Sequence, residues 1–264
     1  LGMRRLRWIS VLGLSVGLLS AAYAVDDDFW IDIKNNREQA VMRYLAQGLD
    51  PNISSREELP AVMWAIQNQA WRVYDLLVAH KQFDPNVTNA HNETPLMYLA
   101  ILGEDQRAQE LIDKGAQVRR LGWTPLHYAA SKGQVSTAQL LLKQGALVNA
   151  QAPDGTTSLM MAARSGDKAM VNLLLQQGAD PTVRSLNKLT AADWAEANKQ
   201  TRIAAQLRDI EQRYDHSNPQ RFTLGEDLEE NATNSAVSAG STKPAAARSS
   251  TSGGSQYFNL ERFE

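Results

Sequence analysis

Histidines and carboxylates are the residues of this chain whose chemistry could support catalysis or metal binding. The four histidines are His80, His91, His127 and His216, and the chain has no cysteine. A zinc or catalytic centre needs three or four convergent ligands, often from His or Cys. None of the histidines has a neighbour at metal-ligand spacing, so the sequence predicts no metal and no cofactor.

The carboxylate runs do not suggest an active site either. Asp26–Asp28 and Glu226–Asp227 both lie in terminal or linker sequence. A paired acid and base would need a pocket that such segments cannot build. Nucleophile-elbow, phosphate-loop and His-Glu-x-x-His patterns are absent from the sequence. We therefore predict that the protein is not an enzyme and has no catalytic residue.

A recurring frame dominates the sequence instead. Residues 122–133 read GWTPLHYAASKG, and Gly145-Ala146 follows twelve residues later. A shift of 33 residues places Thr157 on Thr124, and a shift of 30 in the other direction reaches Thr94. Weaker copies start near Phe29, Leu59 and Thr190. About six copies are expected, over roughly residues 28 to 213.

The residue types in one copy predict where its first helix begins and ends. Thr124 can cap the helix while Pro125 occupies the first helical position, where its missing N–H costs nothing. Ala129 and Ala130 are small enough to let helices approach closely. Gly133 supplies the positive φ that ends the helix.

A second helix follows in each copy. Its apolar face in the best copy comprises Val135, Ala138, Leu141 and Leu142. A single copy cannot bury enough apolar area to fold alone, so stability is expected from stacking, with modified end copies. The second copy, which starts near Leu59, departs from the frame at residues 80–83. The second helix of the last copy is the polar run 202–209.

The period and the Thr-Pro-Leu-His-x-Ala core resemble the ankyrin repeat. The resemblance implies an all-α repeat solenoid of about six ankyrin repeats, elongated and curved, with a helix-turn-helix and a short β-hairpin loop in each. His127 occupies the family's histidine position, which implies hydrogen bonding that ties hairpin and helix together. For His91, a solvated loop position is expected.

The first residues predict export. Residues 1–24 contain a basic start, an apolar middle and Ala22-Tyr23-Ala24, as in a secretory signal peptide. An uncleaved membrane anchor is the alternative, but the apolar run is shorter than the ~20 residues that a span needs. Glycosylation patterns such as Asn92-Glu93-Thr94, at a crowded hairpin, favour a bacterial periplasm over a eukaryotic secretory route. The mature chain is expected to be soluble.

Beyond residues 25–213, the repeat domain, the composition changes. Residues 214–264 are rich in Ser, Ala and Gly and are expected to be disordered, because such a tail buries too little apolar surface. Large apolar residues return in Gln256–Glu264. This stretch is interpreted as a docking peptide for a partner or for the solenoid itself, or as an inert end.

The charge balance limits the class of partner. The whole chain has 27 basic and 29 acidic residues. Without the three arginines of the signal the balance is 24 to 29, or about −5. Nucleic acid would be a poor partner for such a chain. We expect a monomer that binds a protein, with no nucleic acid and no membrane after signal cleavage.

The resemblance implies that a partner binds at the hairpin tips and on the concave face formed by the first helices. The expected tips are Ala90-His91, Arg120-Leu121, Pro153-Asp154 and Leu186-Asn187. A band of aromatic and arginine residues there would be typical of interface hot spots. The selected binding residues are Trp123, Arg120, Leu121, Tyr128, Tyr98, Glu93, His91, Arg164 and Asp154.

Trp123 is expected to contribute most, since its hairpin position is predicted to point along the finger and not into the helical stack. On this interpretation Trp123→Ala leaves stability nearly unchanged. The alternative for Tyr98, Tyr128 and Met161 is that they only pack between adjacent helices.

Three functional hypotheses follow. The first is a non-enzymatic periplasmic scaffold that binds another protein through hairpin tips and concave face. The second is a periplasmic inhibitor or immunity protein that blocks a toxic or exported enzyme. The third, a support factor for an envelope process, is not separable from the first by sequence. The sequence does not identify the partner.

Overall fold

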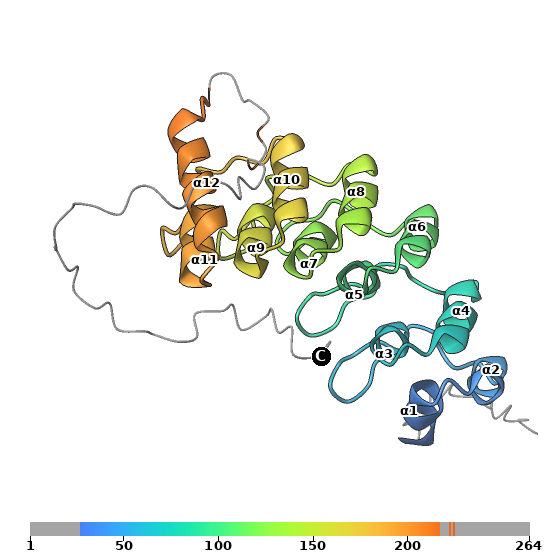
Figure 1. Ribbon diagram of the computed structural model, residues 1–264. Helices are drawn as coiled ribbons and strands as arrows, with labels where there is room; N and C mark the ends of the chain where they lie inside the picture. Colours follow the sequence, from blue (N-terminus) through green and yellow to red (C-terminus); the bar gives the residue numbers. More distant parts are fainter. Residues whose placement is uncertain (1–26, 217–221, 223, 225–264) are drawn as a thin grey trace, which may run out of the picture.

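The computed structural model describes residues 27–216, 222 and 224 (Figure 1). The predicted signal peptide and the segment Gln256–Glu264 lie outside the described residues, as does most of the predicted disordered tail. All structural statements below refer to the described part of the chain.

This part of the chain is built from helices that follow one another in pairs. Within each pair a short turn joins the helices, and a longer hairpin loop leads to the next pair. The helices are α1 (Asp27–Lys34), α2 (Glu38–Ala46), α3 (Ala61–Gln67), α4 (Trp71–Ala79), α5 (Pro95–Leu102), α6 (Asp105–Asp113), α7 (Pro125–Ser131), α8 (Val135–Lys143), α9 (Ser158–Ser165), α10 (Lys168–Gln176), α11 (Ala191–Ala197) and α12 (Thr201–Arg213).

The helices form two layers. The odd-numbered helices, here called the inner helices, stack side by side from α1 to α11, and each contacts the next. The even-numbered outer helices cover them on one side (Figure 1). The row is elongated and arched, which confirms the predicted all-α repeat solenoid.

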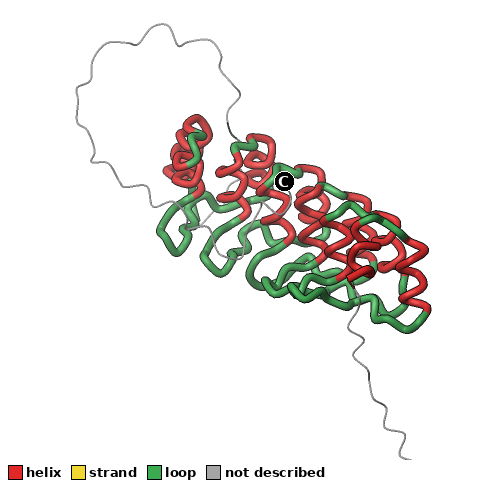
Figure 2. The backbone as a smooth tube through the Cα atoms, turned by 90° about the horizontal axis from the view of Figure 1, so that it is seen from below, coloured by secondary structure: helices red, strands yellow, loops and turns green. Residues whose placement is uncertain are grey.

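The loops gather along one edge of the row (Figure 2). They were expected to be short β-hairpins, but the described residues contain no named strand. Two isolated antiparallel bridges are present, Ser54 to Pro60 and Gln151 to Thr157. The conformation of the hairpin loops is therefore held mainly by turns and side-chain hydrogen bonds.

Threonine stands at the start of the inner helices α5, α7, α9 and α11. Thr157 Oγ1 accepts the N–H of Met160 at 3.3 Å at the start of α9, which satisfies one of the donors that a helix start leaves unpaired. Thr94 and Thr124 precede α5 and α7 in extended conformation, each followed by proline, but neither makes a side-chain cap hydrogen bond. The predicted position of threonine is therefore confirmed, whereas the capping bond predicted for Thr124 is not, because its hydroxyl lies against His127 Nδ1 instead.

Gly133 ends an inner helix and also brings two copies together. Its φ is +67°, which L side chains rarely adopt. A Cβ placed on it would lie 2.9 Å from Asp167 Cγ of the next copy. Asp167 in turn caps α10, where its Oδ1 accepts the N–H of Met170 at 2.7 Å. Any larger residue at position 133 would push this cap away.

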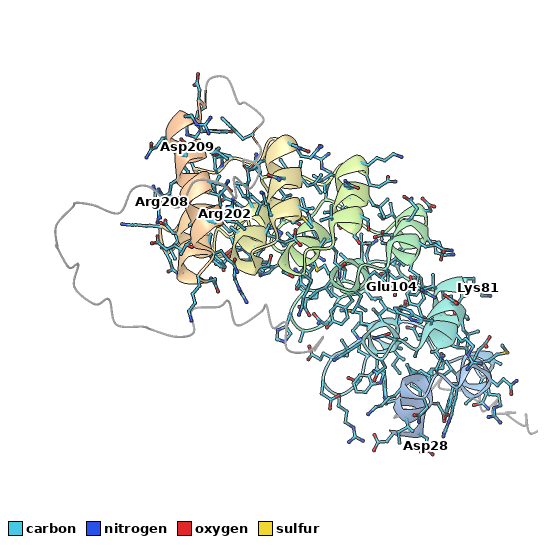
Figure 3. The ribbon with its side chains drawn as sticks, viewed as in Figure 1. Asp28, Lys81, Glu104, Arg202, Arg208 and Asp209 are labelled. Atoms are coloured by element: carbon cyan, nitrogen blue, oxygen red, sulfur yellow. The ribbon has the colours of Figure 1, made fainter. Side chains whose placement is uncertain are left out.

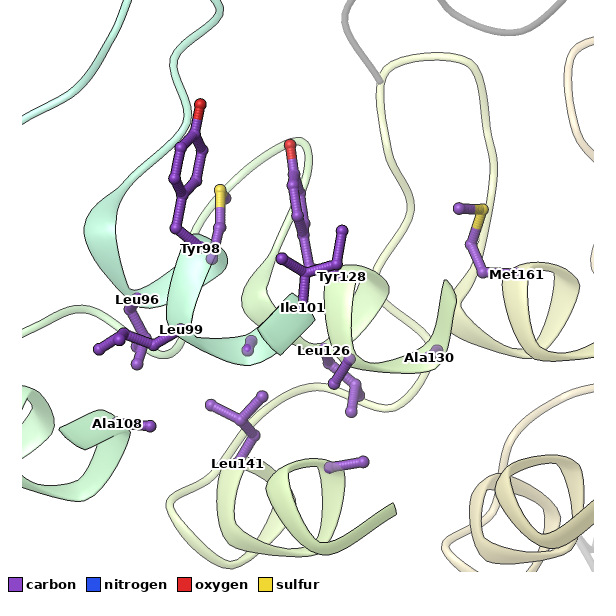
Figure 4. Packing of buried hydrophobic residues seen from close by; sticks show 14 of the residues in the cluster. Leu96, Tyr98, Leu99, Ile101, Ala108, Leu126, Tyr128, Ala130, Leu141 and Met161 are labelled. Carbon is purple, nitrogen blue, oxygen red and sulfur yellow. The ribbon is translucent and has the colours of Figure 1, made fainter. Parts of the chain in front are cut away.

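The core runs continuously through the stack. Alanines and medium-sized apolar residues of the inner helices pack against the apolar faces of the outer helices (Figure 4). Ala129, Ala130, Ala162 and Ala163 are fully buried, so the inner helices approach closely there. Because each pair buries its faces against its neighbours, the core belongs to the stack and not to any one pair.

The two ends differ from the middle. At the first end, the ring of Phe29 makes edge contacts with Trp30 and Tyr44. At the last end, α12 exposes charged residues, and Arg208 pairs with Asp193 at 3.4 Å and with Glu196 (Figure 3). A polar outer helix lets the stack end against water, as predicted.

The chain beyond α12 returns to the solenoid. Phe222 is half-buried and Leu224 is only 4% exposed, within the apolar core. The expectation of disorder from residue 214 onward is therefore wrong for these two residues. Composition misled the prediction, because two apolar residues in a polar segment pack against the apolar core.

Candidate protein-binding surface

The base of the best-matched hairpin is held by a buried histidine. His127 Nδ1 lies 3.2 Å from Thr124 N and 2.9 Å from Thr124 Oγ1, and Nε2 lies 3.0 Å from Thr156 O. A backbone N–H can only donate, so Nδ1 accepts and Nε2 carries the proton given to the Thr156 carbonyl. His127 thus ties its own helix to the next hairpin, which confirms its predicted structural role.

Burial lowers the pKa of His127 to about 4. The ring lies fully inside the stack, where a charged imidazolium would be poorly solvated. It is therefore neutral near pH 7, consistent with the tautomer that the hydrogen bonds require.

A buried carboxylate joins the third and fourth pairs. Glu93 is 2% exposed. Its Oε1 accepts a hydrogen bond from the Tyr128 hydroxyl at 2.6 Å, and its Oε2 accepts from Asn89 Nδ2 at 2.6 Å and Tyr98 Oη at 3.3 Å. Figure 4 shows the two tyrosines projecting in the same direction from α5 and α7. Three donors compensate the burial of the carboxylate.

These positions correct part of the predicted binding surface. Glu93, Tyr98 and Tyr128 lie inside the stack and cannot form an exposed band. The alternative, that Tyr98, Tyr128 and Met161 pack between adjacent helices, is confirmed by their burial. The sequence did not reveal the Glu93 network, because Glu93 and Tyr128 are separated by 35 residues and only stacking brings them together.

The prediction that Trp123 points along the finger and not into the helical stack is also wrong. Its side chain is 8% exposed, and its ring meets His127 edge to face with centroids 5.3 Å apart. The physical reason is Gly122, whose φ of +78° reverses the chain at the tip. Trp123 therefore lies on the returning arm of the hairpin loop, and its side chain is buried in the stack.

The exposed surface of the hairpins is an apolar ridge. Leu121 is 95% exposed and Leu186 is 75% exposed, and Pro153 is exposed at the tip between them. A Cβ on Gly122 would lie 3.7 Å from Pro153 Cγ, so these two tips touch. The N–H of Leu186 donates to the Asp154 carbonyl at 2.8 Å, which joins the next pair of tips. We call Leu121, Pro153 and Leu186 the hairpin ridge.

Cationic side chains flank the ridge. Arg119, Arg184 and Lys188 are exposed on the same hairpins. Arg120 is half-buried, and burial lowers its pKa, which indicates a guanidinium partly removed from water. Asp154 is a half-buried carboxylate beside them, and its Oδ1 accepts the N–H of Thr156 at 3.0 Å. The ridge therefore combines apolar tips with an excess of positive charge.

His91 and Arg164, the other two predicted binding residues, lie outside the hairpin ridge. His91 is exposed in the preceding hairpin, where its N–H donates to Asn89 Oδ1 at 3.0 Å. Arg164 is half-buried in the last turn of α9. Five of the predicted binding residues thus keep surface that a partner could contact: Leu121, His91, Arg120, Arg164 and Asp154.

A family model for ankyrin repeats in three copies matches residues 29–120, 62–152 and 109–185, which together cover more than half of the chain. The chain belongs to the ankyrin repeat family. No curated protein matches it. Ankyrin repeats generally act as protein–protein interaction modules and are typically non-enzymatic. The α11–α12 pair lies beyond the matched residues.

Other kinds of site find little support in the described ankyrin stack. Among residues 27–216, 222 and 224, no three His, Cys, Asp or Glu side chains come together as metal ligands would. The same residues include no helix that is both long and apolar enough to cross a membrane.

Trp123→Ala is expected to lower the free energy of unfolding by about 3 kcal/mol, because it leaves a cavity beside His127. Leu121→Ala, two residues away on the exposed tip, is the matched control and should change stability by less than about 0.5 kcal/mol. Urea unfolding followed by circular dichroism measures both. Equal stabilities of the two variants would mean that Trp123 is not part of the core.

His127 should make stability depend on pH. Its pKa is lower in the folded protein than in the unfolded chain, so the unfolded state binds the proton first as the pH falls. Stability is therefore retained above the unfolded pKa of 6.5 and lost as the pH falls toward about 4. The loss between pH 7.5 and pH 5 should be about 2 kcal/mol larger for the wild type than for His127→Gln. The same pH dependence in both proteins, measured by urea unfolding, would contradict this assignment.

Proposed function

We propose that this ankyrin protein is a non-enzymatic scaffold that binds a protein partner through the hairpin ridge. The observation that carries the proposal is the exposure of Leu121 and Leu186 on tips that flank, and are joined through, the Pro153 tip. A single exposed leucine is common and needs no explanation. The alignment of these two along one edge favours a binding surface over chance exposure.

The hydrogen bonds under the ridge favour a preformed surface. His127 links one hairpin to the next, and the Leu186 N–H to Asp154 carbonyl bond links the tips. Surfaces held in this way change little on binding and lose little entropy. Binding therefore depends on complementarity to the partner and not on folding of the loops.

The flanking charges favour a partner with an acidic surface. Arg119, Arg184 and Lys188 surround the apolar tips, whereas the chain as a whole is acidic. A partner with an apolar patch rimmed by Asp or Glu would be complementary. This arrangement predicts that association slows as salt concentration rises, since exposed charges are screened.

The proposed location is a bacterial periplasm, and the support is the leader-like pattern of residues 1–24. In that compartment the partner would be another envelope or exported protein. An inhibitor of an exported enzyme would use the same ridge, and loss of the partner's activity on binding would distinguish it from a neutral scaffold.

The combined substitution Leu121→Asp and Leu186→Asp should weaken partner binding by about 30-fold or more, as expected when central apolar contacts are lost. The folded state should be unaffected, because both side chains are exposed. Met42→Asp is the matched control, since Met42 is 47% exposed on α2, away from the hairpins. Affinity capture from periplasmic extract with the three proteins, followed by titration of the captured partner, measures the effect. A partner that binds all three equally would rule out the ridge.

A further inference from the structure

The outer helices are not evenly packed. Neighbours α2 and α4, α6 and α8, and α8 and α10 pack directly against each other, whereas α4 with α6 and α10 with α12 make fewer direct contacts. Two gaps therefore interrupt the outer layer, on the side of the molecule away from the hairpin edge (Figures 1 and 2).

The gap between α10 and α12 is filled by the chain itself. Leu224 is buried there, and its N–H donates to Asn172 Oδ1 at 2.6 Å. Phe222 packs nearby, with its ring 6.2 Å from that of Tyr214 and 5.6 Å from the Arg213 guanidinium. Asn172 is the fifth of the nine residues of α10. A Phe-x-Leu segment thus fits a gap between outer helices, with one backbone N–H bonded to the fifth residue of the first helix.

The gap between α4 and α6 has no such occupant among the described residues. It contains a hollow of about 340 Å³ lined by residues of both helices, including Tyr74, Val78 and Ala79 of α4 and Arg107 and Glu110 of α6. The apolar part of the lining comes from α4 and the charged part mainly from α6. A single large side chain with its backbone would fit in a space of this size.

The polar groups of the hollow match those of the filled gap. Asp75 is the fifth of the nine residues of α4, the position that Asn172 holds in α10, and its carboxylate can accept an N–H in the same way. The Tyr74 hydroxyl is buried and has no hydrogen-bond partner within the described residues. Tyr74 lines the hollow, so an apolar side chain placed there would pack against it.

Arg107 leaves these groups available. Its guanidinium stacks on the Trp71 ring at 4.1 Å and pairs with Glu104 at 2.8 Å, while its contact to Asp75 is longer, at 3.9 Å. Asp75 and Glu110 carry negative charge at the hollow, and Arg107 and Lys114 carry positive charge there. The charge of the lining is therefore balanced.

The sequence contains a second segment of this kind. Phe258-Asn259-Leu260 repeats the pattern of Phe222-Thr223-Leu224, and Arg262 follows two residues later. The step from Leu224 to Phe258 is 34 residues. A Gly/Ser-rich linker of this length has a root-mean-square span of roughly 30 Å. Three steps between adjacent packed helices cover roughly 25 to 30 Å, so the second segment can reach the α4–α6 gap.

We propose that residues 257–262 dock in the hollow between α4 and α6 of the same chain. The Leu260 N–H bonds the Asp75 carboxylate, as the Leu224 N–H bonds Asn172. The segment would cover the outer layer and leave the hairpin ridge free, so this docking site is independent of the proposed partner site.

Because the chain has no cysteine, an introduced pair of cysteines can form a disulfide without competition from other thiols. In the full chain, Ala79→Cys places a thiol on the hollow, and Asn259→Cys places one between the two apolar residues of the segment. The matched control is Lys143→Cys with Asn259→Cys, because Lys143 is the ninth residue of α8 as Ala79 is of α4. Intramolecular disulfide formation should be at least ten-fold faster with position 79, measured by non-reducing electrophoresis under mild oxidation.

Three further variants test whether the proposed contacts cause the faster disulfide formation. Phe258→Ala with Leu260→Ala should abolish the ten-fold advantage. Asp75→Ala should reduce it, whereas Asp75→Asn should retain it, because asparagine is the acceptor in the filled gap. Equal rates at positions 79 and 143, insensitivity to Phe258→Ala with Leu260→Ala, or cross-links only between molecules would overturn the proposal. Circular dichroism confirms that each variant is folded.

Discussion

Stacking between neighbouring helix pairs is the interaction on which the rest of this structure depends. Each pair exposes apolar faces on two sides, and only contact with the next pair removes them from water. The fully buried alanines at positions 129, 130, 162 and 163 let the inner helices approach closely. The charged surface of α12 and the aromatic contacts of Phe29 then allow the stack to end.

Stacking also determines which polar residues are structural. His127 reaches the carbonyl of Thr156, and Glu93 receives the hydroxyl of Tyr128, so each contact joins one copy to the next. A buried polar group without partners would be costly, whereas a satisfied one fixes the register between copies. The same contacts support the hairpins from below.

The sequence was sufficient to predict the repeats and the helix starts, because threonine, proline and glycine act locally. It was also sufficient for the role of His127. It failed for Trp123, since the reversal at Gly122 determines which side of the finger a residue faces. It also failed for Glu93 and Leu224, whose partners lie 35 and 52 residues away in the chain. The repeat register predicted that Pro153 and Leu186 lie at hairpin tips, but it did not predict how exposed their side chains are.

We expect the contacts between copies to hold the hairpins rigid, so that the ridge is preformed. Native-state hydrogen exchange of the Thr124 and Glu93 amides measures this rigidity, because these N–H groups bond His127 and Asn89 at the bases of two hairpins. If the hairpins are rigid, both amides exchange only through global unfolding, with the free energy that urea unfolding gives. Exchange through local opening at a much lower free energy would show that the hairpins are not held rigid.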